Sequence, residues 1–129
     1  MFTINDDKSI YLTRGDIAAI EVGASSTNDE PYTFKVGDIV RFSVFEKGSY
    51  DQIVIKKDVS VEKESPTVDI SLYKEDTKIG DLINKPKDYW YEIELNPETY
   101  PQTIIGYDTR GPKIFRLYPE GNDIDGYNI

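Results

Sequence analysis

Acidic and aromatic side chains alternate along one predicted strand, and their spacing is the first sign of chemistry in this chain. Glu92 and Glu94 follow Trp90 in the run 88–95, which places the two carboxylates on one face, about 7 Å apart along the strand. Two carboxylates near that separation, one with a raised pKa, could hydrolyse a glycosidic bond. Such a pair needs a cleft and apolar burial, whereas adjacent glutamates on a strand usually form a solvated face. We therefore assign them no catalytic role.

Histidine and cysteine are both missing from the 129 residues. Histidine is the commonest general base and metal ligand, so its absence excludes a Ser-His-Asp or Cys-His catalytic arrangement. Without cysteine there is no disulfide, no thiolate nucleophile and no thiolate metal site. A hydrolase built on acidic residues and a metal ion stays as an alternative, which the missing histidine disfavours. We expect no enzymatic activity, no catalytic residue, no cofactor and no bound metal.

Two short motifs resemble known binding signals. Arg14-Gly15-Asp16 matches the signal that integrins read, but three residues recur by chance and a glycine between two strands is typical of a turn. We interpret it as a turn. Residues 122–126 resemble part of a calcium loop, with Asp123 and Asp125 at ligand positions 3 and 5. Gly121 falls at position 1, where an oxygen ligand is required, so we expect a solvated acidic segment.

Aromatic residues are the other prominent feature, because the chain has ten tyrosines, five phenylalanines and one tryptophan. Trp90 and its neighbours could stack on sugar rings, or they could pack in the core and at a protein interface, where tyrosine and tryptophan are enriched. No Asn, Gln or His constellation accompanies the rings, so we favour core and interface over a sugar site. The predicted interaction surface comprises Phe45, Tyr89, Trp90, Tyr91, Tyr107 and Tyr118.

The charge balance restricts the partners that this chain can bind. Lysine and arginine number 15 against 24 aspartates and glutamates, a net charge of −9. Such a charge repels phosphate backbones and anionic lipid surfaces, so we expect neither nucleic acid nor a membrane as partner. Residues 1–8 lack the basic and apolar segments of a signal peptide, and no apolar stretch approaches the roughly 20 residues of a membrane span. We expect a protein made and kept in the cytoplasm, or assembled there.

Short runs of alternating apolar and polar residues, separated by turn signals, are the elements that must position these side chains. The clearest run is 39–46, which places Val40, Phe42 and Val44 inward and leaves Phe45 on the outer face, in need of cover. Further strands are expected at 10–13, 17–22, 52–57, 67–73, 88–95, 102–107 and 113–118, and the last two are expected to pair as a hairpin.

Together these runs predict an all-β fold. No long window has the 3.6-residue apolar period of a helix, and one short helical turn is expected near residues 74–83. A chain of 129 residues is typical of one domain, here 1–129, with a lead-in at 1–9 and a polar tail at 119–129. Seven to eight strands at a spacing of about a dozen residues favour an immunoglobulin-like antiparallel β-sandwich.

The order of these elements resembles a known family. The pieces that carry the resemblance are LTRGD at 12–16, FKVGDIVRF at 34–42, TVDISL at 67–72, TKIG at 77–80, YWYEIEL at 89–95 and TIIGYDTRGPKIFRLYPEG at 103–121. In this order and spacing they are similar to the N-terminal domain of upper baseplate proteins from phages and prophages of Gram-positive bacteria. The resemblance covers most of residues 10–121.

The resemblance implies an immunoglobulin-like β-sandwich without enzymatic activity that docks into a virion tail or baseplate, often as a homo-oligomer. Members of that family usually continue into a coiled coil or a receptor-binding module, so we do not expect host attachment from these 129 residues. The leading hypothesis is a virion structural protein that docks onto other virion subunits and is assembled in the host bacterial cytoplasm. The alternative is a carbohydrate-binding module that uses a Tyr/Trp sheet face.

Overall fold

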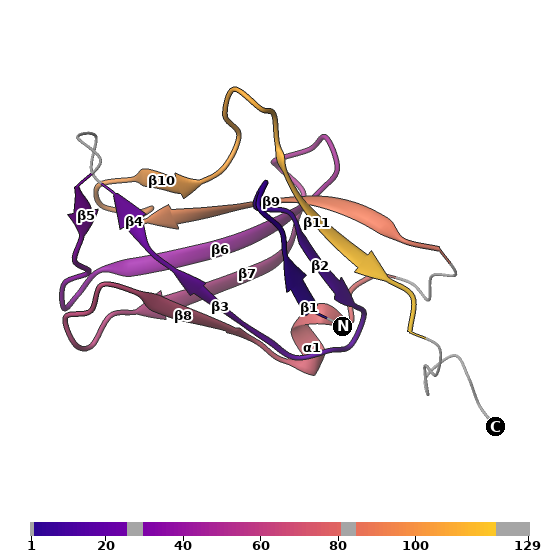
Figure 1. Cartoon of the computed structure of the whole chain (residues 1–129), viewed down its shortest axis with the longest axis horizontal. Helices are drawn as coiled ribbons and strands as arrows, with labels where there is room; N and C mark the ends of the chain where they lie inside the picture. The colour runs from indigo at the N-terminus through magenta and orange to yellow at the C-terminus, as the bar shows by residue number, and fades with distance from the viewer. Residues whose placement is uncertain (1, 26–29, 81–84, 121–129) are drawn as a thin grey trace.

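The computed structural model describes residues 2–25, 30–80 and 85–120. Within them the chain forms eleven strands and one four-residue helix, α1 (Lys74–Thr77). The fold is therefore all-β and sandwich-like, as the alternating runs predict (Figure 1). The helical turn is expected over the longer stretch 74–83, of which residues 81–83 lie outside the described part. No helix in the described part has the length and apolar character needed to cross a membrane.

One large sheet contains seven strands in the order β1-β2-β11-β9-β6-β7, and β10 also pairs with β9. These strands are β1 (Phe2–Ile4), β2 (Ile10–Thr13), β6 (Ile39–Glu46), β7 (Ile53–Ser60), β9 (Lys87–Leu95), β10 (Gln102–Ile105) and β11 (Lys113–Tyr118). A tight turn around Gly48, whose φ of +82° suits glycine, connects β6 to β7 as a hairpin.

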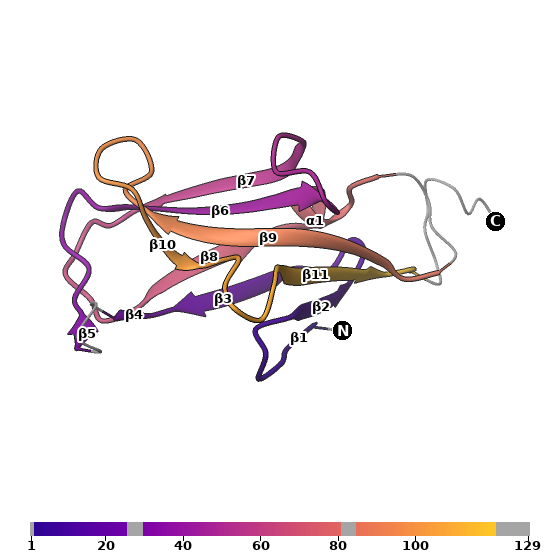
Figure 2. The same ribbon diagram turned by 90° about the horizontal axis from the view of Figure 1, so that it is seen from above.

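Two smaller sheets complete the fold. One pairs β3 (Ala18–Val22) with β8 (Val68–Leu72), and the other pairs β4 (Ala24–Ser25) with β5 (Pro31–Tyr32). Figure 2 shows β3 and β8 running along the same axis as β6, β7 and β9. The order β11-β9-β6-β7 in one sheet, opposite the pair β3-β8, matches strands G-F-C-C′ opposite B-E of a variable-type immunoglobulin sandwich.

The core lies between these layers and follows the predicted alternation. Val40, Phe42 and Val44 of β6 are fully buried, as expected. The inward side of β9 supplies Tyr89 and Tyr91 to the same core. The remaining buried apolar residues of this cluster are Ile10, Leu12, Ile20, Val22, Phe34, Ile55, Val61, Val68, Ile70, Leu72, Ile93, Leu95, Phe115 and Leu117. One continuous apolar cluster thus joins the seven-stranded sheet to the β3-β8 pair.

The N-terminal segment and one strand pairing differ from expectation. The lead-in 1–9 contains β1, which forms an antiparallel pair with β2. β2 runs parallel to β11, so the large sheet is not wholly antiparallel. A parallel pair has no hairpin turn to mark it, since the two strands lie about a hundred residues apart in sequence. Residues 121–129 of the expected polar tail lie outside the described part.

The predicted hairpin between 102–107 and 113–118 is wrong. β10 and β11 each pair antiparallel with β9, β10 with its C-terminal end and β11 with its N-terminal end. The nine residues of β9 extend over roughly 30 Å, long enough to hold both partners along one edge. The chain therefore leaves the sheet after Ile105 and crosses the outer surface before β11 begins. This crossing positions the candidate site.

Candidate functional site

Four aromatic residues gather on the outer face of the large sheet, the side turned away from the core. β6 supplies Phe45 and β9 supplies Trp90, and the two are direct cross-strand partners. Tyr50 comes from the turn after β6, and Tyr107 comes from the crossing after β10. The ring centroids lie 4.9 Å apart for Phe45–Tyr50, 5.3 Å for Tyr50–Trp90 and 6.4 Å for Trp90–Tyr107. These four residues are named the aromatic cluster.

The side chains of the aromatic cluster differ in their exposure to solvent. Phe45 is only 4% exposed, so the cover that its outward position requires is present. Tyr50 provides part of that cover and is 38% exposed itself, while Tyr107 is 64% exposed. Trp90 is half-buried between the two tyrosines. The aromatic cluster is thus buried at Phe45 and exposed to solvent at Tyr107.

A hollow of about 370 Å³ lies beside these rings and is named the outer hollow. Its walls are Phe45, Tyr50, Glu92, Thr103 and Tyr107, which come from β6, β9, β10 and the segments that follow β6 and β10. Aromatic walls with one carboxyl group are typical of sites that bind part of another molecule. The outer hollow is therefore the candidate functional site.

Glu92 is the ionisable group of this hollow and is half-buried. Burial raises the pKa of its carboxyl, and the charge of Glu94 together with a hydrogen bond between the two carboxyls raises it further. The burial comes partly from Gly106, because a Cβ there would lie 2.7 Å from Cγ2 of Thr103 and 3.6 Å from Cβ of Glu92. The crossing after β10 can approach the sheet this closely only because residue 106 has no side chain.

The two glutamates do share one strand face, as their spacing predicts. The two carboxyls are close enough to interact, because the charge of Glu94 raises the pKa of Glu92. The outer hollow is lined by Glu92 and not by Glu94. The arrangement therefore offers the hollow one half-buried acidic group with a raised pKa.

The structure places the six residues of the predicted interaction surface in different environments. Tyr89 and Tyr91 are 2% and 1% exposed and belong to the core, so they cannot contribute to a docking face. Strand alternation is the reason, because Trp90 between them points to the opposite side of β9. The hydroxyl of Tyr91 donates a hydrogen bond to the backbone oxygen of Lys8, which satisfies its polar end. Phe45 is almost fully buried and forms the base of the outer hollow.

Tyr118 lies on the same outer face as Trp90 but at a distance from it. It is four residues beyond Ile114, the cross-strand partner of Trp90, a separation of roughly 13 Å along β11. There its ring contacts the ring of Tyr11 edge-on at 5.9 Å. The predicted interaction surface thus combined residues from the core, from the outer hollow and from a distant part of the outer face. It missed Tyr50, which stands in a turn where no alternation identifies the face.

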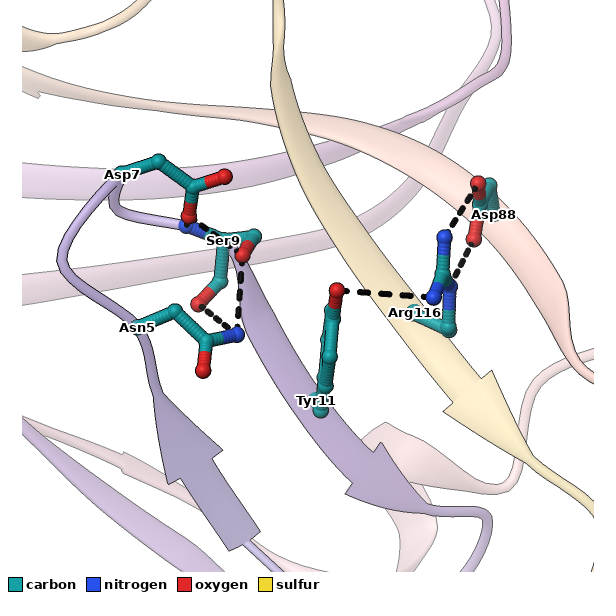
Figure 3. A network of polar contacts seen from close by, with 6 residues as sticks. All are labelled: Asn5, Asp7, Ser9, Tyr11, Asp88 and Arg116. Atoms are coloured by element: carbon teal, nitrogen blue, oxygen red, sulfur yellow. Dashed lines mark hydrogen bonds and ion pairs between the residues drawn. The ribbon is translucent and has the colours of Figure 1, made fainter.

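Arg116, two residues before Tyr118 on β11, is the centre of a polar network (Figure 3). Arg116 donates two hydrogen bonds to the carboxylate of Asp88, at 2.6 and 3.2 Å, and one to the hydroxyl of Tyr11 at 3.4 Å. Its guanidinium also lies 4.8 Å from the Tyr11 ring centre. The bonds to Asp88 raise the pKa of Arg116 further above its ordinary value. These contacts join β2, β11 and β9, so we assign the network a structural role.

The same figure shows a turn between β1 and β2 that is held by its own side chains. Asn5 donates a hydrogen bond to the hydroxyl of Ser9 at 2.9 Å. The backbone N–H of Ser9 and its hydroxyl both donate to the Asp7 carboxylate, at 2.9 and 2.6 Å. These bonds, first the one from the Ser9 hydroxyl, lower the pKa of Asp7. Local hydrogen bonding of this kind stabilises a turn and leaves no group aimed at a ligand.

The Arg14-Gly15-Asp16 motif is a turn, as interpreted. The N–H of Asp16 donates to the oxygen of Thr13 at 3.0 Å, and Gly15 has a φ of +90°. Arg14 is only 7% exposed, and its guanidinium binds the backbone oxygens of Ile79 and Gly80 and the Glu120 carboxylate. A side chain held in this way is not available to a receptor.

The calcium-like residues 122–126 lie outside the described part of the chain. In the part that is described, no three His, Cys, Asp or Glu residues are grouped as a metal ion would require. The chain matches no protein-family model, no curated protein and no solved structure. Its function therefore has to be argued from the outer face of the sheet.

Proposed function

We propose that this domain is a structural subunit of a phage or prophage virion, associated with the tail or baseplate, and that it acts by docking onto other virion subunits. The observation that carries the docking role is the aromatic cluster, whose rings of Tyr50, Trp90 and Tyr107 extend from a buried base to solvent. Tyrosine and tryptophan are enriched among the residues that dominate binding energy at protein interfaces. The assignment to a virion rests on the resemblance in residues 10–121.

Docking by the face of the sheet is favoured over the addition of a strand at β7. β7 is one edge strand of the large sheet, and it carries Lys56 and Lys57 next to an irregular pairing with β6 at Val44 and Phe45. Lysines and bulges on an edge strand oppose the addition of a further strand. The aromatic cluster on the outer face has no such protection.

The virion assignment is tested on particles from the bacterial strain that carries the gene. An antibody against the domain should label purified particles at the tail or baseplate, and mass spectrometry should detect the chain in them. Particles that lack the chain while the lysate contains it would overturn the assignment. Light scattering on the purified domain measures the homo-oligomer that the resemblance implies.

The outer hollow also favours a second candidate, a carbohydrate-binding module. Rings that line a hollow together with Glu92 and Thr103 could stack on a sugar and bind its hydroxyls. Glycan-array binding that is lost in Trp90→Ala and kept in Tyr118→Ala would support this candidate. Absence of binding to any glycan by the wild-type domain would remove it.

A further inference from the structure

We propose that the outer hollow receives the side chain of an arginine from a basic segment of the docking partner. This inference rests on the proposed docking function and names the chemistry of the partner. The aromatic walls, the carboxylate between them and the charge of the whole chain each support it.

The walls suit a flat cation. Phe45, Tyr50 and Tyr107 line the hollow, and Trp90 lies between the two tyrosines in the aromatic cluster. A guanidinium within about 6 Å of a ring centre is attracted by the negative face of the ring. Arginine stacks on aromatic rings and is more weakly hydrated than lysine, so it loses less on entering a hollow of this kind.

Glu92 supplies the charge that an arginine would meet. Some acidic groups on the strands of the large sheet are paired with a cation of this chain, as Asp58 is with Arg41 at 2.8 Å and Asp88 is with Arg116 at 2.6 Å. Among the described residues Glu92 is in no ion pair, and its partner is the carboxyl of Glu94. A half-buried carboxylate beside a second carboxylate is a site that a cation stabilises.

The groups that face Glu92 leave this position open to an external cation. Along β9 the neighbour is Glu94, and across the sheet Ser43 of β6 separates Glu92 from Lys56 of β7. Arg41, the cross-strand partner of Glu94, is bound to Asp58. The remaining ionisable neighbours are the hydroxyls of Tyr50 and Tyr107. None of these neighbouring groups forms an ion pair with the Glu92 carboxylate.

The charge of the chain determines which partner is favoured. A net charge of −9 attracts a basic segment and repels a second copy of the same chain. A neutral sugar would leave the repulsion between the two glutamates in place. An arginine relieves it, and its planar fork can bind a carboxylate with two N–H groups while its face lies on a ring.

The proposal is tested with a blocked pentapeptide that contains one arginine between glycines and with the same peptide carrying citrulline, its uncharged counterpart. The indole N–H of Trp90 gives a single NMR signal because it is the only tryptophan. We expect the arginine peptide to shift this signal and the amides of Glu92 and Thr103 saturably. The citrulline peptide should bind at least about tenfold more weakly, since it loses a charge-assisted bond.

Two substitutions distinguish binding in the outer hollow from a general attraction of the peptide to the negative charge of the chain. Glu92→Gln should weaken binding of the arginine peptide about tenfold, whereas Glu21→Gln removes the same charge from an exposed position on β3 and should leave the affinity unchanged. Tyr107→Ala is a second site variant, in case Glu92→Gln alters the fold. Its exposed ring can be removed without opening the core.

Several outcomes would overturn the proposal. Equal shifts with both peptides, or equal losses in Glu92→Gln and Glu21→Gln, would show that the hollow does not select a cation. Self-association that Arg110→Ala abolishes would make a second copy the occupant, because Arg110 is exposed in the turn after Tyr107. The peptide assay uses no virion, so it can succeed where particle labelling fails, and the reverse. The failure of one proposal is therefore distinguishable from the failure of the other.

Discussion

Phe45 and Trp90 are direct cross-strand partners on the outer face of β6 and β9, and the ring of Tyr50 contacts both of them. An aromatic side chain that is 4% exposed on the side of a sheet turned away from the core is a second, small centre of apolar packing. It holds the rings beside the outer hollow in fixed positions. Rigid aromatic anchors of this kind lose little conformational entropy on binding.

We expect Phe45→Ala to destabilise the fold far more than Tyr107→Ala. Removing a buried phenylalanine costs about 3 kcal/mol of unfolding free energy, because the cavity under Tyr50 collapses only in part. Tyr107 is 64% exposed, so its truncation should cost about 0.5 kcal/mol. Urea denaturation followed by circular dichroism measures both. Similar values for the two variants would mean that Phe45 is not buried in solution.

Gly106→Ala should be destabilising, and Thr103→Ser in the same chain should compensate. The added Cβ would lie 2.7 Å from Cγ2 of Thr103, the methyl group that serine lacks. Crowding of this kind costs about 1–3 kcal/mol, and contacting residues couple by a similar amount. A double-mutant cycle in urea measures the coupling. Gly23→Ala is the matched control, because its nearest neighbour would be the Pro66 oxygen at 3.8 Å.

Glu92→Gln should stabilise the fold at neutral pH and lose that advantage in acid. The folded state raises the pKa of Glu92, first through burial and then through Glu94, so folding is favoured when the carboxyl is protonated. Wild-type stability from this group is therefore complete below the unfolded pKa and falls as the pH rises through the folded pKa. Melting temperatures of both proteins between pH 3 and 8 test this. A variant less stable than wild type at pH 7 would contradict it.

The effect of Glu92→Gln on stability can be compared with its effect on binding of the arginine peptide. A variant that is more stable but binds the arginine peptide more weakly would show that Glu92 opposes folding and favours binding. A purely structural glutamate would not produce this opposition.

Tyr32→Phe should lower the unfolding free energy by about 1.5 kcal/mol at pH 7, because a hydrogen bond to a charged group is lost. Tyr32 donates to the Asp38 carboxylate at 2.7 Å, which with burial raises the pKa of Tyr32 to about 12. Burial opposes ionisation of Asp38, but hydrogen bonds from the Lys35 backbone, Tyr32 and Asn96 lower its pKa overall.

The pH dependence at Asp38 has the opposite sign to that at Glu92. A lowered folded pKa contributes stability above the unfolded pKa, and this is lost as the pH falls through the folded value. The difference between wild type and Tyr32→Phe should therefore shrink in acid. Chemical denaturation at pH 7 and pH 3 measures it. An unchanged difference at pH 3 would contradict the assignment of the bond to ionised Asp38.

Arg14→Lys should destabilise the fold by about 2 kcal/mol, since lysine cannot bind two carbonyls and a carboxylate with one planar fork. The carbonyls are those of Ile79 and Gly80, at 3.1 and 3.0 Å, and the carboxylate is that of Glu120 at 3.0 Å. Thermal unfolding compares this variant with Arg110→Lys, an exposed position where no change is expected. Equal melting temperatures for Arg14→Lys and wild type would refute the structural role of the motif.

Local alternation along the chain was sufficient to predict most strands and much of the core. The inward set Val40, Phe42 and Val44 follows from a side-chain period of two. The same period separates Tyr89 and Tyr91 from Trp90, although the predicted interaction surface grouped all three. The absence of histidine and cysteine is likewise visible in the sequence alone. The turn signal at Gly15 identifies a place where the backbone needs a positive φ. These features depend only on neighbouring residues.

The site itself depended on contacts between distant parts of the chain. The pairing of β10 with β9 instead of β11 carries Tyr107 and Gly106 over Glu92, and no local pattern indicates it. Tyr50 reaches Phe45 from a turn, where side-chain direction does not follow strand alternation. The parallel pair of β2 and β11 joins segments separated by most of the chain. Burial, and with it the raised pKa of Glu92, is a property of packed neighbours, so only the tertiary structure could decide it.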